Sequence, residues 1–563
     1  MIYHCEDHTC NYWDEGEKLP ERCPQCGRKL LRANEADMTG DDWTALGNTL
    51  WDAEASDKKR MVDCFRKAAY LGSAWGVCNL GICMEQGNGV EADPVQAFWL
   101  YQQAVEMGSL NAVCCLGVCY EYGIGTAPDA EKAAELYCKA AEYGSPRGQM
   151  LLAHAFHDGI GVEADAAEAV YWVRAAAYQR YGEGMHRLGV CYEYGDGVEQ
   201  NWERAVHWFR EAAESGVSAA MTDLGWCYEK GCGVEQSWEQ AFSWYRRGAE
   251  CGYPVSMSNL GLCYKRGYGV EQNWQEAVKW YEQGAQCGHL QAMNNLAYCY
   301  EYGEGVEQNE ERALYWYRRG AEAGSDYCMY CLGWNYSNGE GVEQNMTEAI
   351  RWYTAAAEGG NADAMHNLGW LYDHGEGVEQ DMKKAICWYE RAAEQNHPAA
   401  MNSLGECYAM GRGVPRDLET AMEWYRRAAE LGEAMADYNM GWHLEQAGKL
   451  SEAYAHYRKA ADGNDDSAWW ALGRFYENGV VVAQDGKEAR RCYETGEKLG
   501  SVKCKMRLAR CKLLGIGGRR AKKAGLDLCR QALELAKESS EKEDYGYEAE
   551  MNLLRRTIAE NES

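Results

Sequence analysis

Four cysteines near the amino terminus have the arrangement of metal ligands. They are Cys5, Cys10, Cys23 and Cys26. In the second pair, two residues separate the cysteines and a glycine follows, so both sulfurs can reach one tetrahedral ion while backbone amides donate to the thiolates. The first pair has four intervening residues and is a weaker match. We therefore expect one metal ion, held by four thiolates.

The ligand set and the metal leave alternatives open. His8 offers a Cys5-x2-His8 pair that would leave Cys10 out, and sulfur ligands suit iron as well as zinc. We expect structural zinc, with no open position for catalysis. Residues 1–32 bury too little core to fold alone, so the metal would supply the folding energy, on the order of 10 kcal/mol. This segment resembles a zinc ribbon.

Histidines form the second group of candidate functional residues. Two polar clusters stand out, His154 with His157, and His366 with Asp373 and His374. Metal sites need specific ligand spacing, which favours ordinary surface histidines here. The sequence also shows no glycine-rich phosphate loop, nucleophile elbow or paired catalytic carboxylates. We expect that the chain is not an enzyme, and an enzyme or ligand-binding protein using these histidines is the alternative.

A leucine that recurs at a fixed interval predicts the elements that position these residues. It returns every thirty-six residues at Leu80, Leu116, Leu152, Leu188, Leu224, Leu260, Leu296, Leu332, Leu368 and Leu404, with Met440 next. Leu46, Leu472 and Leu508 extend the series at slightly different spacings at its two ends. Such self-similarity is the signature of a tandem repeat array.

Each repeat predicts two helices, counted here from the leucine as position zero. In helix A, methionine at minus three, leucine at zero, glycine or alanine at plus one and tyrosine at plus four share one face. A Gly-x-Gly-Val turn then ends the helix, because glycine adopts the left-handed conformation without steric cost. Helix B carries alanine at plus seventeen, aromatics at plus twenty and twenty-one, and alanines at plus twenty-four and twenty-five. Its expected N-caps are Asn201, Ser237, Asn273, Asn309, Asn345 and Asp381.

The repeats set the expected domain organisation of an all-α protein. Residues 33–40 are predicted to be a linker and residues 41–539 an α/α solenoid of about fourteen helix pairs. Residues 540–563 are predicted to form a capping helix over the last exposed core face. Around Met440 the turn between the helices is shorter, as in a tetratricopeptide unit.

Composition limits the partners and the compartment. The formal charge of −30 argues against nucleic acid and anionic lipid, which need a basic footprint, and favours cationic partners. No apolar run reaches the length of a membrane span, and the start lacks a secretion signal, so we expect a cytoplasmic protein. Stacked helices lie about 8–10 Å apart, too far for disulfides between equivalent cysteines. These plus-three cysteines are therefore expected to be buried and reduced: Cys83, Cys119, Cys191, Cys227, Cys263, Cys299, Cys407 and Cys511.

The repeat pattern Leu-Gly-x-x-Tyr-x-x-Gly-x-Gly-Val, followed by Asp or Asn, Ala, Trp-Tyr, Ala-Ala and Gly, resembles the Sel-one-like repeat (SLR) family. This resemblance implies a right-handed superhelix whose A helices line the concave surface and which serves as a scaffold for protein partners. Secreted members pair a cysteine late in helix B with another one eight residues later. No repeat here carries that pair, so their disulfides, export and penicillin-binding or beta-lactamase association are not carried over.

Positions minus two, plus two and plus five form a second stripe on helix A, which the family analogy places on the concave side. Rigid aromatics flanked by carboxylates suit a peptide carrying Arg or Lys. The alternatives are that these rings only stiffen the solenoid, or that the chain is a structural homo-oligomer, although a monomer is favoured. The expected groove residues are Trp226, Glu229, Tyr298, Glu301, Tyr330, Trp334, His366, Trp370, Asp373, Tyr438 and Trp442.

Overall fold

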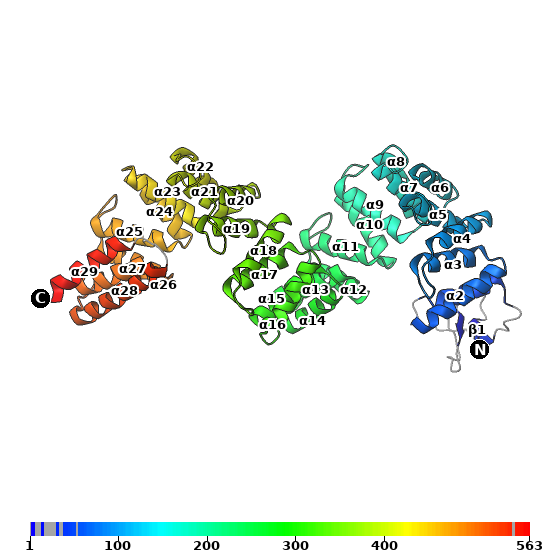
Figure 1. Ribbon diagram of the computed structural model, residues 1–563, viewed down its shortest axis with the longest axis horizontal. Coiled ribbons are helices and arrows are strands. Elements are labelled where there is room, and N and C mark those ends of the chain that lie inside the picture. The colour runs from blue at the N-terminus through cyan, green and yellow to red at the C-terminus, as the bar shows by residue number, and fades with distance from the viewer. Residues whose placement is uncertain are drawn as a thin grey trace. The chain divides into compact units, whose positions relative to one another are not determined.

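The computed structural model describes residues 2–5, 13–15, 30–32, 38–51, 55–542 and 547–562. The chain divides into two compact units, Met1–Ala292 (the first unit) and Met293–Ser563 (the second unit). The boundary falls within the helix α15 (Leu290–Tyr302). Each unit is a stack of paired helices (Figure 1), as predicted.

The strands of the first unit form one small antiparallel sheet in the order β2-β1-β3. They are β1 (Ile2–Cys5), β2 (Trp13–Glu15) and β3 (Leu30–Arg32). Tyr3 pairs with Asp14 on one side of β1, and Cys5 pairs with Leu30 on the other. Of the expected metal ligands, Cys10, Cys23 and Cys26 lie outside the described residues, as does most of the expected linker.

Helices of the first unit follow the predicted spacing. They are α1 (Gly40–Thr49), α2 (Ala55–Tyr70), α3 (Ala74–Gln86), α4 (Pro94–Glu106), α5 (Leu110–Tyr122), α6 (Ala130–Glu142), α7 (Pro146–Asp158), α8 (Ala166–Tyr178), α9 (Gly182–Tyr194), α10 (Trp202–Glu214), α11 (Ser218–Lys230), α12 (Trp238–Glu250), α13 (Pro254–Arg266) and α14 (Trp274–Gln286). Odd-numbered helices are the A helices, and each packs on the even-numbered B helix that follows it.

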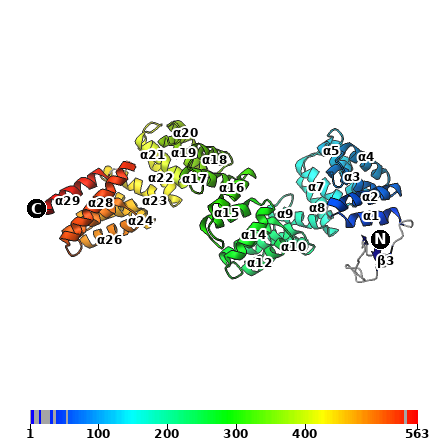
Figure 2. The same cartoon turned by 60° about the horizontal axis from the view of Figure 1, so that its bottom comes forward.

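The second unit continues the series after α15. Its helices are α16 (Glu310–Glu322), α17 (Asp326–Asn338), α18 (Met346–Glu358), α19 (Ala362–His374), α20 (Met382–Glu394), α21 (Pro398–Met410), α22 (Leu418–Glu430), α23 (Ala434–Gln446), α24 (Leu450–Asp462), α25 (Asp466–Asn478), α26 (Gly486–Lys498), α27 (Val502–Leu514), α28 (Lys522–Lys542) and α29 (Glu548–Glu562). The last of these packs on α27 and α28 and lies within the segment 540–563 for which a capping helix is predicted, while α28 itself continues to Lys542. Figure 2 shows the paired stacking from a second direction.

Helix ends follow the expected local chemistry. The side chains of the six predicted N-caps accept hydrogen bonds from backbone amides two or three residues later in the first turns of their helices. At the other end of the A helices, a left-handed glycine closes the turn, as at Gly231 with φ of 74°. The next glycine is needed for space, because a Cβ on Gly233 would lie 2.4 Å from the carbonyl oxygen of Trp202.

A tyrosine, a glycine and a glutamate meet at the centre of many repeats. In α12, Tyr245 is 1 % exposed, and its ring leaves no room for a side chain at Gly225, where a Cβ would lie 2.7 Å from the ring. Its hydroxyl donates to Glu229 Oε2 at 2.8 Å. Burial of a hydroxyl without an acceptor would be costly, so the glutamate stabilises the ring in its place. We call these three residues the Tyr–Gly–Glu trio.

The same hydrogen bond between the residues at plus twenty-one and plus five recurs in both units. It joins Tyr101 to Glu85, Tyr137 to Glu121, Tyr317 to Glu301 and Tyr493 to Glu477. The predicted plus-three cysteines are buried free thiols where the structure describes their state. Within the described ranges, no helix is both long enough and apolar enough to cross a bilayer.

Candidate functional site

The tryptophans at plus two are partly open to solvent. Trp226 in the first unit is 37 % exposed, and Trp334 and Trp370 in the second unit are 44 % and 40 % exposed. Trp442 is also exposed, whereas Tyr298 is half-buried. These tryptophans therefore differ from the plus twenty-one tyrosines, which are sealed in the core.

Some tryptophans on B helices, in contrast, lie under arginine side chains of the same chain. Arg391 lies over the ring of Trp388 at 4.4 Å from its centroid, and Arg427 lies over Trp424 at 4.5 Å. Among the described residues, no cation lies over Trp334. The face of Trp334 is thus open to an outside cation or apolar group. Other plus-two rings have partners within the chain: His374 stacks on Trp370 with ring centroids 4.3 Å apart, and the ring of Trp202 lies 5.8 Å from that of Trp226.

Residues at minus two pack on the buried tyrosines of their own repeats. The rings of Tyr330, His366 and Tyr438 lie 6.0, 5.8 and 5.6 Å from those of Tyr353, Tyr389 and Tyr457, respectively. All three are half-buried. Burial lowers the pKa of His366 to about 4, so this imidazole is neutral at physiological pH. These residues therefore add aromatic surface and little charge to the predicted groove stripe.

The plus-five carboxylates already have partners within the chain. Glu229 and Glu301 accept the hydroxyls of buried tyrosines, and burial raises the pKa of Glu301. Asp373 is buried, and the guanidinium of Arg412 donates to it at 2.8 Å. A contact between these three carboxylates and a basic partner therefore stays a prediction, and each of them already has a partner within the chain.

Arg412 organises a polar network that the sequence analysis did not foresee. It occupies the middle of a Gly-x-Gly turn and contacts Asp373, with Glu406 Oε2 at 3.8 Å. Asn439 donates to Asn402 and to Glu406, which also accepts from Asn402. Arg412 is the one cation found at the middle of these Gly-x-Gly turns in the sequence, a departure that could have signalled its role.

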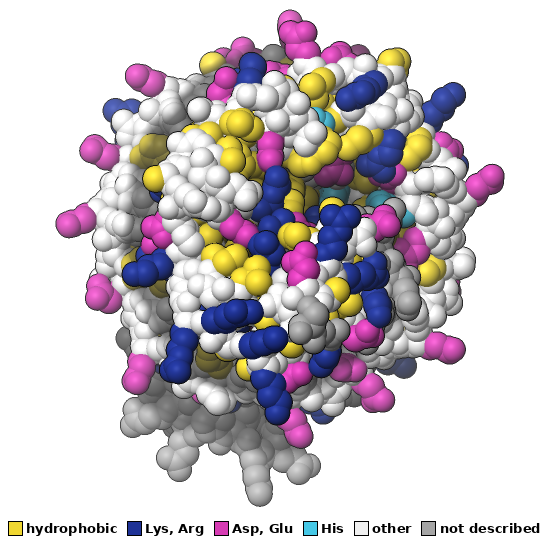
Figure 3. Space-filling model, turned by 90° about the vertical axis from the view of Figure 1, so that its left-hand side faces the viewer, with side chains coloured by type: hydrophobic (Ala, Val, Ile, Leu, Met, Phe, Trp, Pro, Cys, Tyr) yellow, Lys and Arg dark blue, Asp and Glu magenta, His cyan; other side chains and the backbone are white. Residues whose placement is uncertain are grey.

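The carboxyl-terminal end of the second unit carries many cations (Figure 3). Helix α27 has five Lys or Arg residues and no Asp or Glu. Two of its half-buried cations form ion pairs within the unit, because Arg507 donates to Glu550 at 2.6 Å and Arg510 pairs with Glu477, although Arg510 Nε has no hydrogen-bond partner among the described residues. Arg519 in the following turn and Lys523 in the first turn of α28 are exposed.

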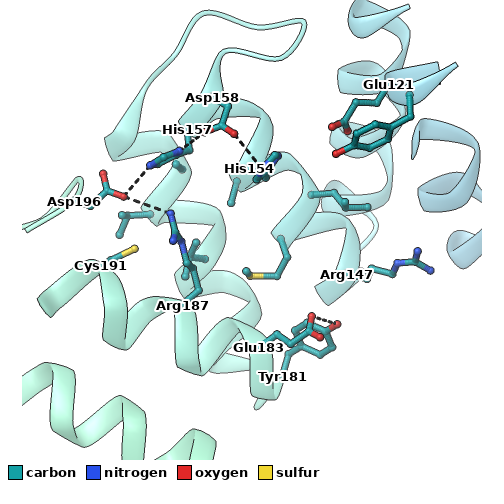
Figure 4. A pocket seen from close by; sticks show the side chains of 17 residues that line it. Glu121, Arg147, His154, His157, Asp158, Tyr181, Glu183, Arg187, Cys191 and Asp196 are labelled. Carbon is teal, nitrogen blue, oxygen red and sulfur yellow. Dashed lines mark hydrogen bonds and ion pairs between the residues drawn. The ribbon is translucent and has the colours of Figure 1, made fainter. Parts of the chain in front are cut away.

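The first unit contains an open pocket of about 690 Å³ next to the histidines of α7 (Figure 4). Its walls come from α5, α7, α8 and α9, and the turn after α9. Apolar side chains line much of it: Met150, Leu151, Ala153, Ala169, Val170 and Val173. Volumes of about 300–1,000 Å³ are typical of ligand pockets.

A hydrogen-bonded cluster forms one edge of this pocket. His157 contacts Asp158 through Nδ1, and its Nε2 lies 3.2 Å from Asp196 Oδ2 (Figure 4). His154 Nε2 lies 3.1 Å from Asp158, and Arg187 lies 3.6 Å from Asp196. The hydrogen bond from His157 lowers the pKa of Asp158. Among the residues with defined positions, no group of three or more His, Cys, Asp or Glu side chains is arranged to hold a metal ion.

Comparisons with known proteins agree with the repeat architecture. A family model described as the Sel1 repeat matches twelve segments of the chain. They are residues 76–109, 112–145, 146–181, 182–217, 218–253, 254–289, 290–325, 326–361, 362–397, 398–433, 434–465 and 468–501. No curated protein matches the chain.

Two solved structures are similar to this chain. The first is c5321, a protective antigen of uropathogenic Escherichia coli strains with an SLR fold, which is 28 % identical over 76 % of this chain and 94 % of its own, with a TM-score of 0.55. The second is a Sel1 repeat protein from Oxalobacter formigenes, which is 31 % identical over 43 % of this chain and 96 % of its own, with a TM-score of 0.40. The first likeness agrees with the paired-helix solenoid described above.

Proposed function

Because this chain belongs to the Sel1 repeat family, whose repeat proteins typically act as protein-interaction scaffolds, we propose that it is a non-enzymatic adaptor that binds a protein or peptide partner. The partner would contact the stripe of A-helix aromatics. A right-handed superhelix with the A helices on its concave face is the geometry that this proposal assumes.

One observation carries the proposal. Trp334 and Trp370 are exposed on successive A helices of the second unit, while the residues next to them in sequence include the buried Gly333 and the buried Leu371. A large ring held at a rigid helix position, with much of its surface in water, is typical of an interface hot spot. Stiffening of the solenoid alone would not require that exposure.

The partner is proposed to carry Arg or Lys. A formal charge of −30 attracts cationic partners at long range. At short range, the face of Trp334 offers the cation–π contact that Trp388 and Trp424 already make with the chain's own arginines. The internal pairing of Glu229 and Asp373 means that aromatic faces, more than these carboxylates, would recognise the cation.

The test is a Trp334→Ala/Trp370→Ala double variant. Partners are captured from cells of the native host with the full-length wild type, and the affinity of the identified partner is then measured for both proteins. Two hot-spot rings are each worth at least about 2 kcal/mol, so we expect roughly 10²- to 10³-fold weaker binding. Tyr315→Ala, which removes an exposed ring from a B helix of the same unit, is the matched control.

The stability of the double variant distinguishes partner binding by these rings from a purely structural role. We expect the double variant to melt within a few degrees of the wild type, because both rings are partly solvated. A large fall in melting temperature would mean that the tryptophans stiffen the solenoid instead of binding a partner. Unchanged affinity of a stable double variant for the partner would also contradict partner binding at the groove.

We also propose that Cys5, Cys10, Cys23 and Cys26 bind structural zinc. The support is the Cys-x2-Cys-Gly spacing of the second pair and the position of Cys5 at the end of β1, paired with β3. Metal analysis of the full-length chain should give one equivalent of zinc, which Cys23→Ser/Cys26→Ser removes. Iron in place of zinc, or retention of the metal after Cys10→Ser but not His8→Ala, would replace this ligand set.

We also propose that the protein is cytoplasmic and monomeric. Burial raises the pKa values of the Cys227 and Cys263 thiols to about 12, so they stay protonated and unreactive in a reducing compartment. Light scattering at several concentrations should give the mass of one chain. A stable oligomer would favour a structural homo-oligomeric element over an adaptor.

A further inference from the structure

The pocket of the first unit lies where one repeat lacks its central aromatic ring. Position plus twenty-one is a buried aromatic in the neighbouring repeats, such as Tyr137, Phe209 and Tyr245, each at most 1 % exposed. In α8 the same position is Val173. An isopropyl group cannot fill the space of a phenol ring, and close-packed surroundings relax only partly around a smaller side chain.

The residues at plus one and plus five, which contact the central ring in other repeats, also differ in this repeat. Plus one is a glycine where the ring needs space, but in this repeat it is Ala153. Ala297 is also an alanine at this position, and its repeat keeps Tyr317. Plus five, which is Glu229 in the trio, is His157. All three members of the trio are thus replaced together in residues 146–181.

The pocket reaches the residues that would surround the missing ring. Ala153, Val173 and His157 all line it, and so does Cys191 from the next A helix. Cys191 is the counterpart of Cys263, which lies close enough to Tyr245 to raise the pKa of that phenol. A ring bound in the pocket would therefore meet the same neighbours that a tyrosine of the chain meets elsewhere.

The chemistry of the lining selects among ligands. The carboxylates at the pocket are already satisfied, because Glu121 accepts from Tyr137, Glu183 accepts from Tyr181, and the two aspartates pair with the histidines. A cationic ligand would find no unpaired carboxylate to offset its desolvation, and the guanidinium of Arg147 already donates to Asn111 and Cys115. A neutral ring would bury its faces against the apolar walls and place a hydroxyl beside Asp196, because both nitrogens of His157 already contact aspartates.

We propose that this pocket binds a phenol ring, with the ring against the apolar wall of Val173 and Ala153 and the hydroxyl donating to the carboxylate of Asp196 beside His157. The ring would come either from a free small phenol or from a tyrosine side chain of a partner. The proposal does not depend on the tryptophan stripe of the second unit.

The test uses the full-length chain with ¹³C-methyl-labelled methionines, titrated with p-cresol, the analogue of a tyrosine side chain. Met150 lines the pocket, and Met221, which is buried in α11, is the matched control. We expect a saturable shift of the Met150 methyl signal and none of the Met221 signal. Toluene should bind at least about tenfold more weakly than p-cresol, the factor that one hydrogen bond to a charged carboxylate supplies. An unresponsive Met150, or an equal response of Met221, would overturn the proposal.

Two variants examine the ring site and its polar edge separately. Ala153→Gly/Val173→Tyr restores the ring-over-glycine packing of the neighbouring repeats and should abolish the Met150 response. Asp196→Ala keeps the apolar walls and should remove the preference for p-cresol over toluene, which also serves if the double variant fails to fold. A response that persists in the folded double variant, or a preference that survives Asp196→Ala, would contradict the assignment.

N-acetyltyrosinamide, a capped tyrosine, distinguishes the two sources of the ring. If it shifts Met150 as p-cresol does, the pocket accepts a partner's tyrosine, and if only p-cresol binds, the ligand is a free phenol. The Trp334→Ala/Trp370→Ala variant should keep its p-cresol response, so failure of the partner-binding groove and failure of this site can be told apart.

Discussion

Residues 146–181 and 218–253 are two copies of one repeat within the same unit, and they use the same space in opposite ways. Both consist of an A helix and a B helix of thirteen residues each. In the second copy, Tyr245 fills the centre and donates to Glu229. In the first copy, Val173 leaves a pocket of about 690 Å³. The helix pairs are therefore kept while the centre of a repeat varies.

The repeat array tolerates the loss of one central ring for a physical reason. Each repeat packs on its neighbours on both sides, so the array retains the helix pair even when one repeat buries less of its own surface. The Tyr–Gly–Glu trio stabilises the repeat locally. Its loss lowers the local stability and leaves an accessible pocket. A comparison of matched substitutions in the two copies can measure this exchange.

The largest effect is expected from exchange of the central residue. Tyr245→Val should lower the local unfolding free energy by about 3–5 kcal/mol, because it removes a buried ring and leaves a cavity. Val173→Ala should cost less, about 1–2 kcal/mol, since the pocket is already open on one side. Hydrogen exchange of α11–α12 and α7–α8 in the full-length variants would measure both. Equal costs would show that the ring is not what distinguishes the two copies.

A smaller effect is expected at plus one. Gly225→Ala would place a Cβ 2.7 Å from the Tyr245 ring, so we expect a loss of about 1–3 kcal/mol from overpacking. Ala153→Gly has no ring to relieve and should cost only the helix propensity of glycine, about 1 kcal/mol. In the Tyr245→Val background, Gly225→Ala should become nearly neutral. Simple additivity of the two changes would contradict direct contact between the ring and the glycine position.

The smallest effect concerns the carboxylate of residues 182–217, where the central ring is Phe209 and has no hydroxyl to donate. Burial, reinforced by Asp223, raises the pKa of Glu193. The folded state then holds its proton to higher pH than the unfolded chain, so this group loses stability as pH rises from its ordinary pKa through the raised one. Glu193→Gln should raise stability at pH 7 by well under 1 kcal/mol after solvent screening and have no benefit below pH 4.

Glu229→Gln is the control for this pH comparison. Glu229 accepts a phenol hydroxyl, so its replacement should not stabilise the protein at pH 7. Thermal melts of both variants and the wild type across pH 4–8 would test the difference. A gain in both variants would mean that the hydroxyl of Tyr245 does not stabilise the carboxylate beside it.

Sequence periodicity alone predicted the helix pairs, their N-caps and their glycine-closed turns. These features depend on contacts within a few residues, such as the bond from the Asn309 side chain to the Arg312 amide. Burial of the plus-three cysteines followed from their place on the same helix face as the leucines. Exposure of the plus-two tryptophans was left open by the sequence, because rings on that stripe can also pack between adjacent A helices, and the structure shows them partly exposed.

Only the tertiary structure decided what the polar side chains of the stripe do. Whether Glu229 is free or bonded depends on a tyrosine sixteen residues later, and Asp373 depends on Arg412 from the next repeat. The pocket likewise requires the sequence-distant Ala153, Val173 and Cys191 to meet. Local propensity determines where helices begin and end, but hydrogen bonds and cavities form between helices, and their geometry exists only after the helices have packed.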